Sequence, residues 1–264
     1  GDAVKKEADK LKIVYTPLHG SGNIPVREVL KRAGFNSVCV VKEQEMPDPS
    51  FSTVKSPNPE DKEGFEIAFN YAKDADIILG TDPDCDRVGV VLPDGNGGFV
   101  ALSGNQIGVL LCDYILSGLS ENGKLPANGA VIRSIVSTKM VEPICKEYNI
   151  KLFDVLTGFK YIGGKIDEFE EGGEYSFLFG FEESCGYLSG KHARDKDGVN
   201  ASLLICEMAA FYKAKGISVL CHLNSLYEKY GYYNEKVISL VFPGLSGMEK
   251  IKGIMAGLRA EPLK

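Results

Sequence analysis

Tryptophan is absent from the 264-residue sequence, histidine occurs three times, and the seven cysteines include no CxxC pair. An odd number of scattered cysteines argues against a disulfide framework, and the missing CxxC spacing argues against a structural zinc site. The scarcity of histidine also argues against a histidine-based metal centre. This cysteine usage is typical of a reducing compartment and predicts a cytoplasmic protein.

Long apolar runs and blocks of basic residues are missing as well. The longest apolar stretch, at residues 107–116, is interrupted by Asp113 and is shorter than the ~20 residues of a membrane span. No signal peptide is recognisable in the first residues. Lys and Arg number 30 against 36 Asp and Glu, so the formal net charge is −6. We therefore expect neither a nucleic acid nor a membrane as a partner.

What the sequence does contain is an alternation of apolar and amphipathic segments. Its length and its 44% hydrophobic content predict two domains, given ~100–200 residues per domain. Strands are expected at residues 11–15, 37–41, 75–80, 130–136, 151–156 and 175–180. Helices are expected at residues 25–34, 63–75, 104–119, 138–149 (with a kink-prone proline) and 198–216, and residues 157–172 read as a loop that opens a helix. This pattern predicts the α/β class, with two consecutive α/β domains, each a mainly parallel mixed sheet flanked by helices.

Two of the expected strands end in the same way. In residues 76–84 and again in residues 177–184, an apolar strand leads through glycine into an acidic loop. Ligands of open α/β sheets bind beyond the carboxyl ends of the strands. The two acidic loops therefore predict a single cleft with two different tasks.

The first acidic loop, TDPDCDR, places Asp82, Asp84 and Asp86 at alternate positions and Arg87 directly after them. Carboxylates at this spacing in an extended loop can turn toward one point, and Mg²⁺ prefers such oxygen ligands. A guanidinium beside them suits a phosphate partner. We predict a metal site; the alternative is a solvated acidic turn in which Arg87 pairs with a neighbour. An EF-hand is excluded, because its sixth and twelfth positions would be Arg87 and Pro93.

Several motifs together resemble the α-D-phosphohexomutase superfamily, the phosphoglucomutase/phosphomannomutase enzymes. They are KIVYTPLHGSGNIPVREVLKRAGF, VKSPNPE, TDPDCDRVGV, LTGFKYIG, GFEESCGY and RDKDGVNA. They follow one another as in that family and span about residues 11 to 200. A partial resemblance to haloacid-dehalogenase-like phosphatases, which place DxD after a strand, is weaker, because Asp86 stands where their usual Thr or Val would be.

The first resemblance implies a role for each motif. Asp82, Asp84 and Asp86 would hold Mg²⁺, and Arg87 would contact the phosphoryl group or the serine that carries it. The other implied roles are sugar hydroxyl binding by Glu182 and Ser184, sugar phosphate binding by Lys196, and a cleft wall at Thr157 and Gly158. On composition alone, Glu182 and Glu183 fit a charged surface turn as well as a binding loop, and Lys196 fits a solvated face better than a binding site. His19 and the turn at residues 20–22 fit either a tight turn or a phosphate contact.

The resemblance also implies a reaction. A phosphohexomutase interconverts hexose 1-phosphate and hexose 6-phosphate, here with glucose as the expected hexose, through a phosphoserine and a bisphosphate intermediate. Mg²⁺ would be the cofactor, glucose 1,6-bisphosphate the activator and hexose phosphate the partner. The residues do not indicate whether glucose, mannose or pentose phosphate is preferred.

Two parts of the family pattern are missing from the 264 residues. No loop resembles the TASHNP serine loop of the first domain, and no Arg/Ser/Gly/Thr-rich phosphate loop of the fourth domain occurs. We expect a metal-binding domain at residues 1–102, a sugar-binding domain at 103–238, and a strand and helix at 239–264 leading toward the fourth domain. The chain alone should be inactive without the first and fourth domains. The alternatives are a non-catalytic sugar-phosphate or metal-binding module and, more remotely, a phosphatase.

Overall fold

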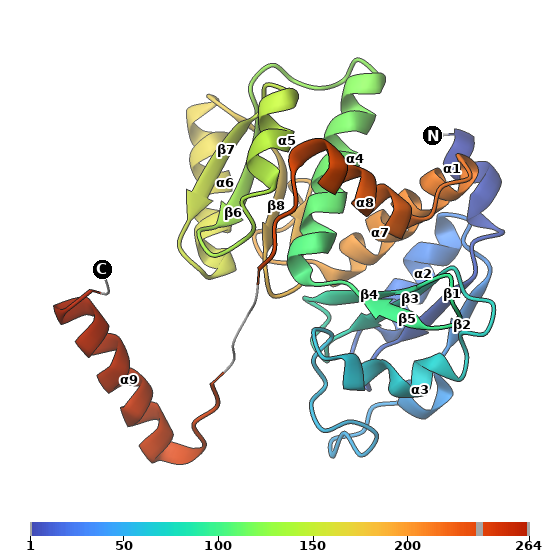
Figure 1. The fold of residues 1–264 in the computed structure, drawn as a ribbon, viewed down its shortest axis with the longest axis horizontal. Helices are drawn as coiled ribbons and strands as arrows, with labels where there is room; N and C mark the ends of the chain where they lie inside the picture. Colours follow the sequence, from blue (N-terminus) through green and yellow to red (C-terminus); the bar gives the residue numbers. More distant parts are fainter. Residues whose placement is uncertain (1, 236–239, 263–264) are drawn as a thin grey trace. The chain divides into compact units, whose positions relative to one another are not determined.

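The computed structural model describes residues 2–235 and 240–262 and divides into two compact units, one ending at Tyr233 and one beginning at Asn234. The second unit contains helix α9 (Gly244–Ala260). The strand expected ahead of α9 falls partly on positions 236–239, which lie outside the described residues, and residues 240–243 form no strand. The expected domain boundary at residues 238 and 239 lies outside the described residues as well. The first unit contains both sheets (Figure 1).

The first sheet has the strand order β2-β1-β3-β4-β5. Its strands are β1 (Ile13–Thr16), β2 (Val38–Val40), β3 (Ile77–Thr81), β4 (Val88–Pro93) and β5 (Phe99–Ala101). Strand β1 is parallel to β2 and β3, whereas β4 is antiparallel to both of its neighbours. Neither β4 nor β5 was expected. Because β4 is buried on both faces over most of its length, it lacks the alternation that marks a half-buried strand.

The second sheet repeats this arrangement with the order β7-β6-β8-β9. Its strands are β6 (Gly129–Ser134), β7 (Lys151–Val155), β8 (Ser176–Glu182) and β9 (Gly186–Ser189). Strand β6 is parallel to β7 and β8, and the unexpected β9 is antiparallel to β8. Strands β3 and β8, which precede the two acidic loops, occupy equivalent places. The predicted class of two mixed α/β sheets flanked by helices is confirmed.

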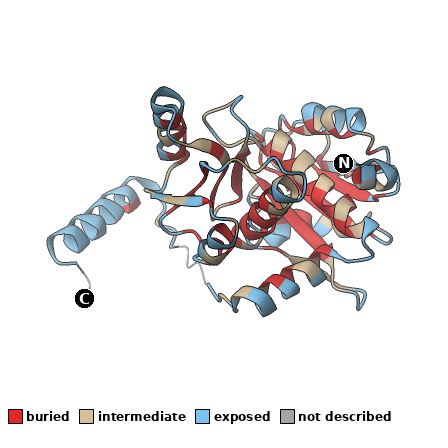
Figure 2. Ribbon diagram, turned by 90° about the horizontal axis from the view of Figure 1, so that it is seen from above, coloured by how far each residue is buried: buried red, intermediate tan, exposed pale blue. Residues whose placement is uncertain are grey.

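Helix α7 joins the two sheets into one core. The helices of this unit are α1 (Asp2–Ala8), α2 (Asn23–Arg32), α3 (Glu66–Phe69), α4 (Gly104–Glu121), α5 (Val141–Glu147), α6 (Phe159–Gly172), α7 (Gly198–Ala214) and α8 (Val219–Tyr230). Helix α7 contacts α1, α2, β3 and β4 on one side and α4 and β9 on the other. A continuous cluster of buried apolar side chains therefore runs through both sheets, with buried residues on the strands and inner helix faces (Figure 2).

Two helix predictions need correction. The helix expected at residues 63–75 is a 3-10 turn (Lys62–Phe65), the single turn α3, and further turns closed by i to i+3 hydrogen bonds. Glycine and asparagine are weak helix formers, so Gly64 and Asn70 favour this broken path. Pro143 does not kink α5, because it lies in the first turn, where its missing N–H is not needed. Helix α8 was not anticipated.

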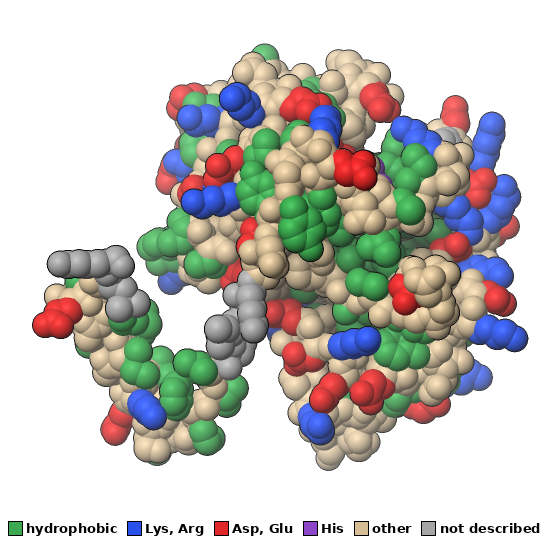
Figure 3. All heavy atoms as spheres, in the orientation of Figure 1, with side chains coloured by type: hydrophobic (Ala, Val, Ile, Leu, Met, Phe, Trp, Pro, Cys, Tyr) green, Lys and Arg blue, Asp and Glu red, His purple; other side chains and the backbone are tan. Residues whose placement is uncertain are grey.

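The distribution of surface charge and the lengths of the helices agree with the composition. Acidic and basic side chains are interspersed over the face drawn in Figure 3. Within the part of the chain that the structure describes, no helix has the length and apolar character needed to cross a bilayer.

Candidate functional site

The aspartate loop, residues 82–87, follows β3 and rests on the turn that precedes α2. A Cβ atom added to Gly20 would lie 2.5 Å from the Cα of Pro83. A Cβ atom added to Gly22 would lie 2.7 Å from the Sγ of Cys85. Glycine is therefore required at both positions, because any side chain would push the aspartate loop away from the sheet.

His19 in the same turn has a structural role. Its Nδ1 lies 2.8 Å from the carbonyl oxygen of Met46, and its Nε2 lies 2.7 Å from Oγ1 of Thr53. The residue is buried, and its backbone is left-handed, with φ of 63°. Since both ring nitrogens have partners within the protein, the geometry favours the tight-turn interpretation over a phosphate contact.

The three aspartates of the loop converge. One carboxylate oxygen from each of Asp82, Asp84 and Asp86 lies within 4.8 Å of the others. Opposite ligands of an octahedral Mg²⁺ are about 4 Å apart, so modest side-chain rotation would bring these oxygens to coordination distance. A set of three hard carboxylate ligands fits Mg²⁺. Asp82 is buried, Asp84 is exposed and Asp86 is half-buried, which leaves the open side of the cluster facing solvent.

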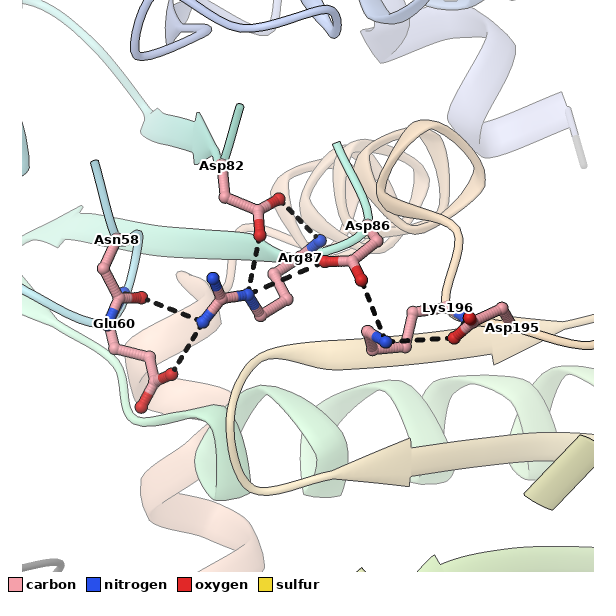
Figure 4. A network of polar contacts seen from close by, with 7 residues as sticks. All are labelled: Asn58, Glu60, Asp82, Asp86, Arg87, Asp195 and Lys196. Atoms are coloured by element: carbon pink, nitrogen blue, oxygen red, sulfur yellow. Dashed lines mark hydrogen bonds and ion pairs between the residues drawn. The ribbon is translucent and has the colours of Figure 1, made fainter. Parts of the chain in front are cut away.

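Arg87 is held tightly beside these carboxylates (Figure 4). Its backbone N–H and its Nε donate to the two oxygens of Asp82 at 2.9 and 2.6 Å. Its Nη1 donates to Asn58 and Glu60, both at 3.3 Å. Burial raises the pKa of Asp82 to about 6 even though the Arg87 hydrogen bonds and charge oppose this change. The four hydrogen bonds of Arg87 fix its guanidinium group at the edge of the aspartate loop.

The glutamate loop, residues 182–185, follows β8 and adjoins the aspartate loop directly. Arg87 and Gly186 form an antiparallel bridge, and the N–H of Val88 donates to the carbonyl of Cys185 at 3.1 Å. Cys85 and Cys185 occupy matching positions, and both have left-handed φ angles, of 58° and 63°. The structure therefore brings the two acidic strand-end loops together.

The glutamates of this loop are anchored within the protein. The buried Glu182 accepts a hydrogen bond from the N–H of Gly158 at 2.6 Å. Burial raises its pKa, although this hydrogen bond opposes the change. Glu183 accepts from Ser134 at 2.9 Å and from Ser137 at 3.4 Å. These contacts are not those of a solvated surface turn.

The remaining expected site residues lie on the same edge of the second sheet. Ser184 is half-buried next to Glu183. Gly158, which is partly exposed, precedes α6 with φ of 119°, a backbone conformation that glycine adopts readily. Thr157 is exposed beside it. The hydrogen bond from Gly158 to Glu182 joins this segment to the glutamate loop.

Lys196 spans the two loops. Its Nζ lies 2.9 Å from a carboxylate oxygen of Asp86 and 2.9 Å from one of Asp195 (Figure 4). Its stem crosses Gly186, where an added Cβ would be 2.3 Å from the lysine Cδ, and its Nζ is 5.5 Å from the centre of the Phe159 ring. Burial lowers the pKa of Lys196, but the two carboxylates outweigh this effect and raise it. With 17% of its side chain exposed, this lysine does not belong to a solvated face.

Several residues of the site were not anticipated individually. Asn58 and Glu60, which hold Arg87, lie in the VKSPNPE motif, so their polar side chains in a proline-rich loop were a usable signal. Phe159 and Asp195, which flank Lys196, lie in the LTGFKYIG and RDKDGVNA motifs; Asp195 precedes Lys196 directly, whereas the approach of Phe159 to Lys196 depends on tertiary packing.

Comparisons with known proteins agree with this geometry. Residues 2–96 match the family described as phosphoglucomutase/phosphomannomutase, alpha/beta/alpha domain II, and residues 103–230 match domain III of the same family. A phosphoglucomutase from Staphylococcus haemolyticus (strain JCSC1435) is 39% identical over 251 residues, which cover 94% of this chain and 45% of that protein. The chain thus spans about half the length of this relative.

Solved structures share the fold at lower identity. A phosphoglucomutase/phosphomannomutase family protein from Burkholderia thailandensis superposes with a TM-score of 0.62 at 20% identity, covering 85% of this chain and 46% of that one. An N-acetylphosphoglucosamine mutase from Aspergillus fumigatus, solved in complex with GlcNAc-6P and magnesium, has a TM-score of 0.56 at 16% identity, covering 85% and 51%.

Proposed function

Since the chain belongs to the phosphoglucomutase/phosphomannomutase family, we propose that the protein of which it is part interconverts hexose 1-phosphate and hexose 6-phosphate, with glucose as the hexose. The observation that carries the proposal is the direct junction of the aspartate and glutamate loops. A mutase must hold a phosphoryl group and a sugar in one cleft. This junction places charged groups suited to the phosphoryl group beside hydrogen-bonding groups suited to the sugar.

On the phosphoryl side, Asp82, Asp84 and Asp86 would hold Mg²⁺. When bound, the ion would neutralise charge that develops on the transferred group. Arg87 would bind phosphoryl oxygens, and its fixed position beside Asp82 supports this role because a preorganised donor needs no rearrangement during reaction.

On the sugar side, Glu182 and Ser184 would bind adjacent hydroxyls. A carboxylate accepts hydrogen bonds and a hydroxyl both donates and accepts, so the pair suits a diol. Lys196 would bind the phosphate of the sugar, and Thr157 and Gly158 would form the wall of the cleft. The contact between Gly158 and Glu182 supports a common sugar site for these segments.

The remaining machinery would come from outside this chain. We propose that residues 1–102 and 103–238 correspond to the second and third domains of the enzyme, with residues 239–264 leading into the fourth. A phosphoserine on the first domain would serve as the nucleophile, and glucose 1,6-bisphosphate would act as activator. Coverage of 45% of a phosphoglucomutase supports this division. The cytoplasm is the proposed location.

A coupled assay for conversion of glucose 1-phosphate to glucose 6-phosphate, with Mg²⁺ and catalytic glucose 1,6-bisphosphate, tests the proposal. The full-length protein should turn over, Arg87→Ala in it should lose at least about tenfold in kcat/KM, and the 264-residue chain should show no turnover. A full-length protein that binds sugar phosphate without turnover would favour the non-catalytic module. Release of inorganic phosphate by this chain would favour a phosphatase.

A further inference from the structure

We propose that Lys196 is shared between the metal site and the substrate. Its ammonium group pairs with Asp86 and Asp195; a cation bound among the aspartates takes Asp86 from it, and the ammonium then turns to the phosphate of the sugar. Metal and sugar phosphate would then bind with positive coupling through this one side chain. The inference rests on the proposed function, because it takes the metal and sugar phosphate sites from there.

The ion pairs of the aspartate loop show that Lys196 and a divalent cation would share a ligand. Asp82 is neutralised by Arg87 through two hydrogen bonds, and Asp86 is neutralised by Lys196 at 2.9 Å. Nε of Arg87 is 3.6 Å from the other oxygen of Asp86. Asp84 forms no ion pair with either cation within the described structure. Lys196 therefore occupies a carboxylate that a divalent cation would need, and the two cations compete for it.

The surroundings of Lys196 leave its ammonium group room to turn toward a phosphate. Its stem lies against Gly186, and its Nζ is 5.5 Å from the centre of the Phe159 ring, so the ammonium can turn about its last bonds while the stem keeps its contact with Gly186. Lys196 also lines an open hollow of about 600 Å³, together with Lys160, Arg194 and three aspartates, Asp167, Asp195 and Asp197. Arg194 is already paired with acidic side chains of α6. Lys196 is thus poised to turn from Asp86 toward a phosphate in this hollow.

Thermodynamic linkage gives the consequence. If Mg²⁺ at Asp86 raises the affinity for sugar phosphate, sugar phosphate must raise the affinity for Mg²⁺ by the same factor. Direct attraction between the ion and the phosphate would also produce coupling. Only the part that passes through Lys196 disappears when its ammonium is removed, and this difference can be measured.

The first experiment needs no metal. Binding of glucose 1-phosphate to the 264-residue chain is measured by calorimetry in the presence of EDTA, for wild type, Asp86→Asn and the matched control Asp84→Asn. Both substitutions remove one negative charge from the same loop, but only Asp86→Asn removes a carboxylate partner of Lys196, which keeps its contact with Asp195 in both variants. We expect Asp86→Asn to bind more tightly than Asp84→Asn by on the order of fivefold. Equal affinities of these two variants would overturn the proposal.

The second experiment measures the coupling itself. Mg²⁺ titrations with and without glucose 1-phosphate are compared for wild type, Lys196→Met and the control Lys160→Met, which removes a charge from the same hollow. We expect the coupling factor to fall in Lys196→Met and to persist in Lys160→Met. Unchanged coupling in Lys196→Met overturns the inference and leaves the proposed function standing. Failure of all variants to bind either ligand would overturn the inference for this chain, whereas the turnover assay on the full-length protein tests the proposed function separately.

Discussion

At the scale of single residues, the shape of the aspartate loop depends on Gly22, which has no side chain. Gly22 lies against β1 and the loop, and an added Cβ would be 2.6 Å from the hydroxyl of Tyr15 and 2.7 Å from Oγ1 of Thr81. Those two hydroxyls form a buried hydrogen bond of 2.8 Å beneath the loop. The position of the aspartates therefore depends on the absence of a side chain at Gly22.

Gly22→Ala should lower the free energy of unfolding by about 1–3 kcal/mol, because overpacking forces neighbouring atoms to shift. Urea denaturation followed by circular dichroism measures this change. The matched control is Gly118→Ala in α4, where an added Cβ meets nothing within 4 Å and should stabilise the protein by about 0.5–1 kcal/mol. A neutral Gly22→Ala would show that the loop adapts without cost.

At the scale of elements, the start of α7 positions the proposed phosphate ligand. Asp197 caps the helix by accepting from the N–H groups of Val199 and Asn200, both at 2.9 Å. The N–H of Gly198 donates to the carbonyl of Cys85 at 3.1 Å, which attaches the helix to the aspartate loop. Lys196, directly before the cap, is thereby held beside Asp86.

Replacing Asp197 by alanine should cost about 1–2 kcal/mol of stability through the lost cap. Asp197→Ser keeps a capping oxygen, so it should retain most of that stability. Thermal and urea denaturation of both variants distinguish the cap from the hydrogen bond that Asp197 also makes with Nε2 of His192 at 2.8 Å. Equal losses in the two variants would assign the effect to the contact with His192 instead.

At the scale of the whole molecule, the two sheets of the first unit share one core. Ile205 on α7 is fully buried in the apolar cluster that runs through both sheets. Loss of packing at this position should therefore be felt in each sheet, although the sheets are formed by different parts of the chain.

Ile205→Ala should destabilise the unit by about 2–5 kcal/mol, the usual cost of a cavity in a core. Hydrogen exchange followed by mass spectrometry can read peptides from β1 and β3 separately from peptides of β6 and β8. We expect the free energy of opening, measured by amide exchange, to fall by the same amount in the peptides of β1 and β3 and in those of β6 and β8. Faster exchange confined to one sheet would mean that the sheets unfold independently.

The sequence by itself determined where the two acidic loops lie along the chain and which strands precede them. The apolar runs before both acidic loops, the alternate spacing of the aspartates, and the strands at residues 13–16, 77–81 and 129–134 all depend on near neighbours along the chain. Periodicity and spacing record such local relations directly.

Tertiary structure decided the rest, because it depends on contacts between distant segments. Strands β4 and β9 lack a regular alternation since both of their faces are largely buried. The ring nitrogens of His19 find Met46 and Thr53 across a long loop, and Lys196 meets Asp86 only because α7 packs beside the first sheet. No local pattern encodes these pairings, whose partners are chosen by the packing of two sheets around one helix.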